Sequence, residues 1–429
     1  MSAFLDSQGL AAQGTRESDP AWLSALRQEA SAAVLASGLP TGKTEAWKYT
    51  SVRKLSGQSI AAAKTSSNDA AVAWANEILG DDGTAKFFIV NGHAAGDLAS
   101  TEGLSVSSLT DALKSAPAAL ESRLGKIAHS EFFAGINSAL FEDGLVVRIS
   151  SKYKGQPIHI VHVADGNASY PRLLIEAEAN SKASIVETYL SKPGQDDLCT
   201  AVTEVHLADG AHLDHLRVIE GGEPSTHLGT LAVLQDRNST YTSRSVVMGG
   251  KLSRVEIDAR MSGPGATCNL DGMYHAINSE HVAHHTLITH ADNHGSSTED
   301  YRGLVDDRAH AVFDGIIIVD QGTKGTSAHQ QNHNLLLSDS ATVNTKPHLE
   351  IDSDDLSASH GATVGSVNPD QLFFLRARGI DENHARSILT FSFVRSILDR
   401  IEVEAVKERL ISRLLTRLPY GEDLAELAK

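Results

Sequence analysis

The sequence predicts a mainly β fold, a β-solenoid core flanked by helical regions at its N- and C-terminal ends. The middle of the chain holds many short runs rich in Val, Ile, Leu and Thr, separated by Gly, Asp, Asn and Ser, which is typical of strands joined by turns. Small residues recur within these runs at a nearly constant spacing. Both ends of the chain instead place apolar residues at helical intervals.

The N-terminal region, residues 1–84, is predicted to be helical. Its first helix begins after Asp19 and Pro20, where an acidic N-cap precedes a proline at the first helical position. Gly38 ends this helix. A second short helix is predicted over residues 68–80, before a turn rich in Gly and Asp.

Residues 85–375 form the predicted β core. Many of its runs alternate apolar and polar residues, which is the pattern of a strand with one buried face. The clearest runs are KFFIVNG, LVVRIS, IHIVHVADG, RLLIEAEA, SIVETYLS, TEVHLADG, HLDHLRVIEGG and AVFDGIIIVDQG.

A repeat is visible inside this region. A small residue opens a strand after a polar turn at Ala183, Ala211, Ser239 and Ala266, at separations of 28, 28 and 27 residues. Without helices between the strands, this period suits the coils of a β-solenoid, in which each coil buries its inward side chains by stacking on its neighbours. Hydrophobic residues make up 41% of the chain but aromatic residues only 5%, and an aliphatic composition also suits stacked coils. A β-sandwich with evenly spaced turns is the alternative.

The C-terminal region, residues 376–429, is predicted to be helical. Val394 and Ile397 lie on one predicted helix face, and a second apolar face runs from Val406 to Leu418. Over residues 376–417 nine Arg or Lys residues stand against six Asp or Glu residues, in a chain of net charge −17. A basic helical tail on an acidic body predicts a docking element, and a solvated amphipathic helix pair is the alternative.

The charge and the cysteines exclude several classes of protein. A net charge of −17 argues against sequence-independent binding of nucleic acid and against binding to an anionic membrane surface. The sequence has no signal-peptide pattern at its start and no apolar run long enough to span a membrane, so we expect a cytoplasmic protein. Cys199 and Cys268 are the two cysteines, too few for a self-sufficient iron–sulfur site, and any cluster would need shared ligands.

Histidines are concentrated at positions 275 to 294, where six of the 20 lie. In a strand, His281 and His285 would share one face while His284 points to the other, so only part of the set could converge on a metal ion. His284 and His285 are the candidates for such a site, and solvent-facing or stacked histidines are the alternative. A histidine-rich metal-binding protein is therefore one alternative function. A β-helix enzyme acting on polysaccharide is another, although no residue pattern specifies a reaction.

One further histidine stands apart. His360 lies between Ser359 and Gly361 in the stretch KPHLEIDSDDLSASHGATVGSVNPDQLFFLRARG, among small residues that would leave an imidazole accessible. An accessible imidazole suits a metal ligand, and a polar histidine in a turn is the alternative.

Two motifs carry a resemblance to a known family. LPTGKTEAWKYTSVRKL (39–55) and QQNHNLLLSDSATVNTKPHLEIDSDDLSASHGATVGSVNPDQLFFLRARGI (330–380) resemble signatures of the SufB/SufD family, the scaffold subunits of the SUF system for iron–sulfur cluster assembly. The resemblance implies a right-handed parallel β-helix between helical regions. It also implies a non-catalytic scaffold that pairs with a SufB-like subunit and with the ABC-type ATPase SufC. Self-association of the isolated chain and binding of FAD by the complex are left open.

The resemblance also implies the site. It gives His360 a role at the interface between the two scaffold subunits, where it works with a cysteine of the SufB-like partner on a transient shared cluster. Some relatives have Cys two residues earlier, where this chain has Ala358, and that difference favours the SufD branch of the family. The C-terminal region is implied to engage the ATPase, and the residues that we assign to this docking are Arg378, Ile388, Phe391 and Val394.

Overall fold

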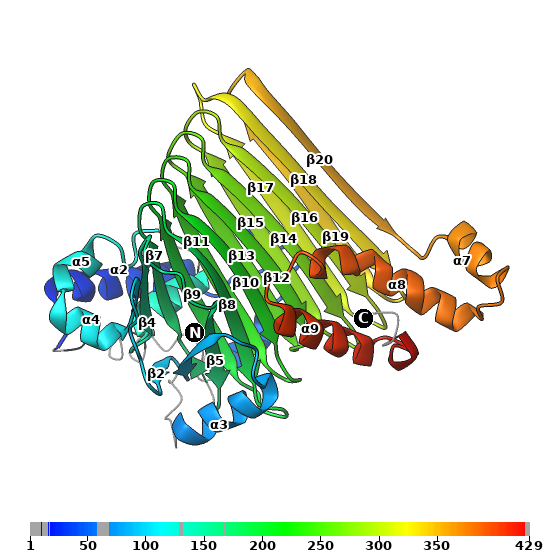
Figure 1. Ribbon diagram of the computed structural model, residues 1–429, viewed down its shortest axis with the longest axis horizontal. Helices are drawn as coiled ribbons and strands as arrows, with labels where there is room; N and C mark the ends of the chain where they lie inside the picture. Colours follow the sequence, from blue (N-terminus) through cyan, green and yellow to red (C-terminus); the bar gives the residue numbers. More distant parts are fainter. Residues whose placement is uncertain are drawn as a thin grey trace.

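A parallel β-solenoid of about 8 turns forms the body of the molecule, flanked by the N-terminal and C-terminal helices (Figure 1). The computed structural model describes residues 10, 16, 18–57, 68–127, 132–166 and 168–424, so parts of the predicted region 1–84 lie outside the described residues. Strands that follow each other along the chain alternate between two sheets. The predicted fold class, mainly β with helical ends, is therefore confirmed.

We call the sheet that ends in β20 sheet 1 and the sheet that ends in β19 sheet 2. Sheet 1 runs in the order β2 (His93–Ala95), β1 (Ala85–Val90), β5 (Ile158–Ala164), β8 (Lys182–Ser191), β10 (His212–Glu220), β12 (Thr240–Met248), β14 (Thr267–Ala276), β16 (Ser296–Val305), β18 (Lys324–Leu336) and β20 (Asp355–Gly365). Sheet 2 runs in the order β19 (Thr342–Ile351), β17 (His310–Val319), β15 (His281–His290), β13 (Leu252–Met261), β11 (Thr226–Gln235), β9 (Leu198–Leu207), β7 (Arg172–Ala177), β4 (Leu145–Ile149) and β3 (Leu104–Ser108), with β6 (Ala168–Ser169) beside β9.

Neighbouring coils pair in parallel and almost without register shifts. From β8 to β16 the ladder of sheet 1 joins Lys182, His212, Thr240, Thr267 and Ser296, which are 30, 28, 27 and 29 residues apart. The predicted period is therefore the length of one coil. Parallel pairing between coils excludes the β-sandwich alternative, whose sheets are antiparallel.

One member of the predicted repeat is out of register. Ala211, Ser239 and Ala266 each directly precede a strand of sheet 1, and the residue that precedes β8 is Ser181. The carbonyl of Ser181 accepts from the amide of His212, whereas Ala183 lies inside β8 and pairs with Leu213. The predicted repeat therefore lies two residues too late at this coil.

The space between the sheets is filled by aliphatic and small residues, and glycine makes room for large ones. Gly272 on β14 pairs with Tyr301 on β16, and a Cβ at Gly272 would lie 2.3 Å from the Tyr301 ring. The ring is fully buried, so it cannot move aside for an added Cβ.

We expect Gly272→Ala to destabilise the protein by at least about 2 kcal/mol, because overpacking a core at a ring that cannot move is costly. The measurement is the free energy of unfolding from denaturant titration. The matched control is Gly365→Ala on β20, where an added Cβ meets nothing within 4 Å. An equal effect of the two substitutions would contradict the packing argument.

The N-terminal helices cover the first coils. They are α2 (Ala21–Ser37), α3 (Asn68–Leu79), α4 (Leu109–Ser115), α5 (Pro117–Glu121) and α6 (Phe132–Leu140). The first two match the predicted helices, but the predicted cap of the first is wrong. Pro20 occupies the N-cap position, and Asp19 instead accepts a 2.7 Å hydrogen bond from Nε of the buried Arg27. Helices α4 to α6 lie between strands and were not predicted.

The C-terminal helices are α7 (Pro369–Arg376), α8 (Glu382–Leu398) and α9 (Glu404–Arg417). Helices α8 and α9 lie against the outer face of sheet 1 (Figure 1). Their predicted apolar faces are confirmed, because Val394 and Leu410 are buried in one cluster with Val246 and Met273 of the sheet. Within the described ranges, no helix combines the length and the apolar character needed to cross a membrane.

Candidate functional site

His360 lies on the last strand of sheet 1, at the end of the solenoid. Its neighbour across the ladder is Gln330 of β18, which is fully buried. Ala358, two residues earlier on β20, contacts the core between the sheets, and side chains two apart in a strand share a face. His360 therefore belongs to the inward-facing row, yet it is exposed because, in the part of the chain that the structure describes, no coil follows β20.

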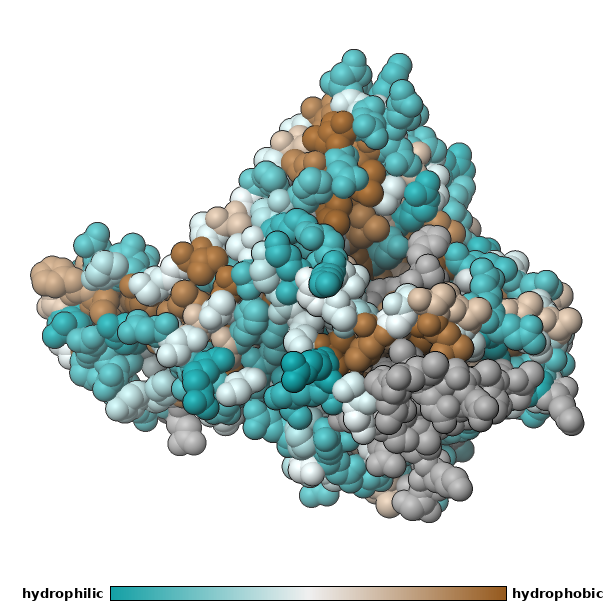
Figure 2. Space-filling view, turned by 180° about the vertical axis from the view of Figure 1, so that it is seen from behind, coloured by the Kyte–Doolittle hydropathy of each residue, from teal (hydrophilic) through white to brown (hydrophobic). Residues whose placement is uncertain are grey.

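This end of the solenoid is uncapped among the described residues. β19 and β20 are the outermost strands of their sheets, and the inward-facing Ile351 and Val364 are 41% and 44% exposed. Seen from behind, hydrophobic residues also gather over the upper part of the solenoid (Figure 2). A stacked-coil protein needs a cap where its core would otherwise meet water, and unpaired edge strands can pair with another chain.

A buried carboxyl lies two coils below His360, behind Gln330. Glu299 of β16 pairs with Gln330 in the ladder, and the Gln330 side-chain amide donates to Glu299 Oε2. Glu299 is 2% exposed, and burial raises its pKa to about 7. The open end thus holds an imidazole, an amide and a carboxyl in one inward-facing row.

The raised pKa of Glu299 predicts a pH dependence of stability. A carboxyl whose pKa rises from 4.5 to about 7 on folding favours the folded state below pH 4.5. This contribution is lost as the pH rises through 7, by about 3 kcal/mol in total. Glu299→Gln removes the titration, so we expect the variant to gain stability relative to the wild type between pH 5 and pH 8.

Denaturant titrations of both proteins at the two pH values measure this gain. Glu350→Gln, on the outer face of β19 with its side chain 55% exposed, serves as the control and should not change the pH profile. A wild-type profile that Glu299→Gln leaves unchanged would show that the carboxyl does not titrate in this range.

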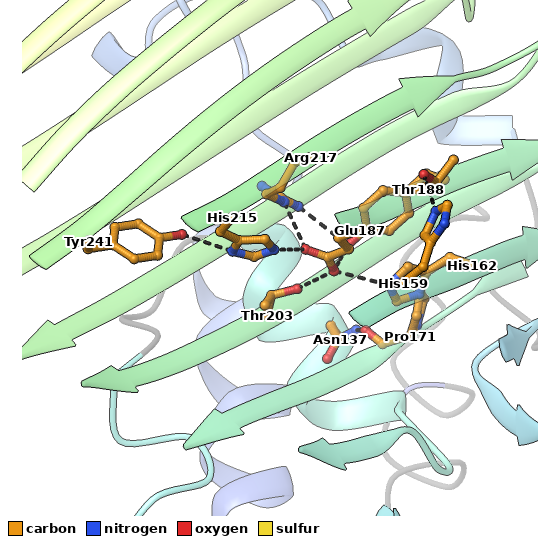
Figure 3. A network of polar contacts seen from close by, with 11 residues as sticks. Asn137, His159, His162, Pro171, Glu187, Thr188, Thr203, His215, Arg217 and Tyr241 are labelled. Carbon is orange, nitrogen blue, oxygen red and sulfur yellow. Dashed lines mark hydrogen bonds and ion pairs between the residues drawn. The ribbon is translucent and has the colours of Figure 1, made fainter. Parts of the chain in front are cut away.

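A second polar network lies deep between the sheets, around Glu187 of β8 (Figure 3). Glu187 is fully buried. Its carboxylate accepts hydrogen bonds from five side chains on four strands. The donors are Arg217 Nε at 3.0 Å, His162 Nε2 at 3.0 Å, His215 Nε2 at 3.1 Å, the Tyr189 hydroxyl at 2.6 Å and the Thr203 hydroxyl at 2.7 Å.

The positive charge and the hydrogen-bond donors around Glu187 favour its ionised form more than burial disfavours it. Burial acts to raise the pKa of Glu187, but the charge of Arg217 and the bonds from His162 and His215 hold the pKa well below its usual range. The adjoining cavity, lined by His162 and Tyr189, has a volume of only about 20 Å³, room for about one water molecule. The cavity is thus too small for a larger ligand, and we interpret the network as one that stabilises the fold.

The structure separates His284 from His285. His284 points inward, where its Nε2 lies 3.0 Å from the hydroxyl of Ser245. His285 points outward, where its Nε2 accepts a 2.7 Å hydrogen bond from Arg254, and burial and then the Arg254 charge lower its pKa. The two imidazoles lie on opposite faces of β15, and no group of three or more His, Cys, Asp or Glu side chains among the described residues could hold a metal ion.

The N-terminal motif lies on the outer face of sheet 2. Trp47 is buried, and the guanidinium of Arg254 lies 3.8 Å from the centre of its ring. Thr50 is 3.0 Å from His281 Nε2, and Glu45 accepts a 2.9 Å hydrogen bond from Lys346 of β19. This segment therefore connects the N-terminal helices to the outer face of the last coil.

Neither cysteine is placed to act as a ligand. Cys199 and Cys268 are free and buried. Burial raises the pKa of Cys199 to about 12 and raises the pKa of Cys268 further. Both remain neutral thiols at physiological pH, whereas the thiolate is the form that binds metals.

The four residues assigned to ATPase docking do not share one exposed surface. Phe391 and Val394 are buried against the outer face of sheet 1, and Ile388 is half-buried there. Arg378 is exposed and lies over the ring of Phe374, with 3.3 Å between its guanidinium carbon and the ring centre. Two aromatic residues missed by the sequence analysis complete this exposed group, Phe373 at 74% and Phe374 at 54% exposure.

Comparison with known proteins gives consistent matches over nearly the whole chain. Residues 10–160 match the family described as the SufBD protein N-terminal region, and residues 159–393 match the SUF system FeS cluster assembly SufBD core domain. An iron–sulfur cluster assembly SufBD family protein of Synechocystis is 30% identical over 87% of this chain and 86% of its own length.

Two further relatives are described as the iron–sulfur cluster assembly protein SufD. The iron–sulfur cluster assembly protein SufD of Escherichia coli is 28% identical over 96% of this chain and 95% of its own. The SufD protein of Bacillus subtilis is 28% identical over 65% of this chain and 64% of its own. The resemblance found in the two sequence motifs therefore extends over the whole fold.

Proposed function

Because the chain belongs to the SufBD family of the SUF iron–sulfur cluster assembly system, we propose that it is a non-catalytic scaffold subunit of the SufD type. In this role it holds a nascent cluster jointly with a partner. The cluster is cargo that is built and passed on.

The observation that carries the proposal is the position of His360 on the inward face of an uncapped solenoid end. An imidazole at this position faces whatever chain covers the end. A partner with its own β-solenoid and a cysteine at its edge, such as a SufB-like subunit, would cover Ile351 and Val364, pair with the edge strands, and bring a thiolate toward His360.

The two buried cysteines support a shared site. With both thiols neutral and enclosed, this chain offers an imidazole but no thiolate. Iron–sulfur clusters take mostly thiolate ligands. The partner must therefore supply the sulfur ligands, and a cytoplasmic setting would keep those thiols reduced.

Docking of a SufC-type ATPase is the second part of the proposal. Phe373, Phe374 and Arg378 form an exposed group in and just after α7, a helix that projects beyond the strands (Figure 1). Aromatic residues and arginine supply much of the binding energy at protein interfaces. This group can bind a partner without unpacking α8 and α9 from the sheet.

We expect the double variant Phe373→Ser, Phe374→Ser to weaken binding of the ATPase subunit at least ~10-fold. An aromatic side chain that is buried at an interface commonly contributes about 2 kcal/mol or more to the binding free energy. Co-purification from cells that express the chain with a SufB-like subunit and a SufC-type ATPase tests the partner set. Titration calorimetry gives the affinity.

Ile78→Ser on α3 is the matched control, because it also removes an exposed apolar side chain, 48% exposed, at a site far from α7 (Figure 1). Unchanged affinity of the double variant would move the ATPase site elsewhere. Failure of the wild-type chain to co-purify with either partner would overturn the scaffold proposal.

A further inference from the structure

Gln330 is the buried core residue that lies next to His360. The two residues are ladder partners on parallel strands, so their side chains lie about 5 Å apart on the same face. Gln330 is fully buried. Its Oε1 has no hydrogen-bond partner among the described residues, and a buried acceptor without a partner costs free energy.

The orientation of the Gln330 amide is fixed from two sides. Glu299 accepts from its Nε2. At pH 8, above the raised pKa of Glu299, the ionised carboxylate can only accept, so the oxygen of the amide must face away from Glu299. On sheet 2, Gly315 leaves the space that the amide fills, because a Cβ there would lie 2.2 Å from Gln330 Nε2. The free oxygen is therefore held in place beside an imidazole that needs an acceptor.

We propose that Gln330 is a positioning residue for His360: rotation of the exposed imidazole brings its N–H to the free Oε1 of Gln330, and this bond determines which ring nitrogen faces the partner. This inference rests on the ligand role proposed for His360. A histidine that binds a metal through one nitrogen usually donates from the other, and this second bond fixes the tautomer and the ring orientation. Glu299 and Gly315 contribute indirectly, because they hold the side-chain amide of Gln330 in place.

Three variants of the full-length chain separate positioning from packing. Gln330→Met keeps the length of the side chain and removes the acceptor, whereas Gln330→Glu keeps the length and the Oε1 acceptor. Gln331→Met, on the exposed outer face of the same strand, is the matched control. If Gln330 acts only in packing, Gln330→Met should be tolerated better than Gln330→Glu, which places a second buried carboxyl beside Glu299. If Gln330 positions His360, Gln330→Glu should preserve the imidazole tautomer and Gln330→Met should not.

The direct readout is the tautomer of His360 by ¹⁵N-histidine NMR at pH 8, with His360→Ala used for assignment. We expect one dominant tautomer in the wild type, in Gln330→Glu and in Gln331→Met, and a mixed population in Gln330→Met. In the co-purified complex, Gln330→Met should lower the rate of cluster formation about 10- to 100-fold, the usual effect of losing a bond behind a metal ligand.

The outcomes distinguish this inference from the proposed function. If His360→Ala leaves cluster formation unchanged, the ligand role itself fails. If His360→Ala abolishes it while Gln330→Met changes neither the tautomer nor the rate, only the positioning role fails. Thermal unfolding of Gln330→Met shows whether the variant is folded, and if it is not, the tautomer and rate in Gln330→Glu decide, since a mixed tautomer there overturns the proposal.

Discussion

Replacing His360 with alanine is expected to abolish cluster formation by the assembled complex while leaving the complex itself intact. The imidazole is exposed at the solenoid end, and its proposed bond to Gln330 is a single bond at an exposed side chain, so its removal should cost little stability. Losing a bond behind a metal ligand already lowers metal affinity about 10- to 100-fold, so loss of the ligand should have a larger effect. Reconstitution of the cluster on the purified complex, followed by its visible absorption, measures the loss.

Two controls keep this result interpretable. His329→Ala removes another exposed imidazole from the neighbouring strand, but on the outer face, where it lies 2.8 Å from the hydroxyl of Ser359. It should leave cluster formation unchanged. Co-purification of His360→Ala with both partners shows that assembly is intact. Normal growth of a strain that has no other cluster assembly system and carries only His360→Ala would refute the role.

The architecture could be predicted because a solenoid repeats similar residues along the sequence at intervals of one coil length. Each coil places a small residue at the same turn, and Ala211, Ser239 and Ala266 hold this position. The local pattern did not give the register, as Ala183 shows, since a strand slipped by two residues keeps the same alternation of faces. The unpredicted helices α4 to α6 are short and lie among strands of the first coils, where no such repeat is present.

The site could be predicted only where its chemistry is local. The small residues around His360 indicate accessibility, and its strand indeed lies at an open end. Gln330 and Glu299 lie 30 and 61 residues before His360, and their relation to it depends on the ladder register. Phe391 and Val394 had the pattern of an apolar helix face, but the pattern alone does not reveal whether that face covers the protein's own sheet or a partner.

The buried network of Glu187 gives the largest effect that we expect on stability. Arg217→Met keeps most of the volume of the side chain but leaves the carboxylate of Glu187 without its cation, inside a core where both residues are fully buried. Removing one partner of a buried ion pair typically costs about 3–5 kcal/mol. We expect a loss of that size in the free energy of unfolding, measured by denaturant titration at pH 8.

The loss should depend on whether the second partner of the ion pair is still charged. Glu187→Gln combined with Arg217→Met removes both charges and should cost less than Arg217→Met alone. Arg237→Met is the matched control, because its pair with Asp209 is 62% and 50% exposed and should contribute less than about 1 kcal/mol. If Arg217→Met costs no more than Arg237→Met, the network does not stabilise the solenoid as its geometry implies.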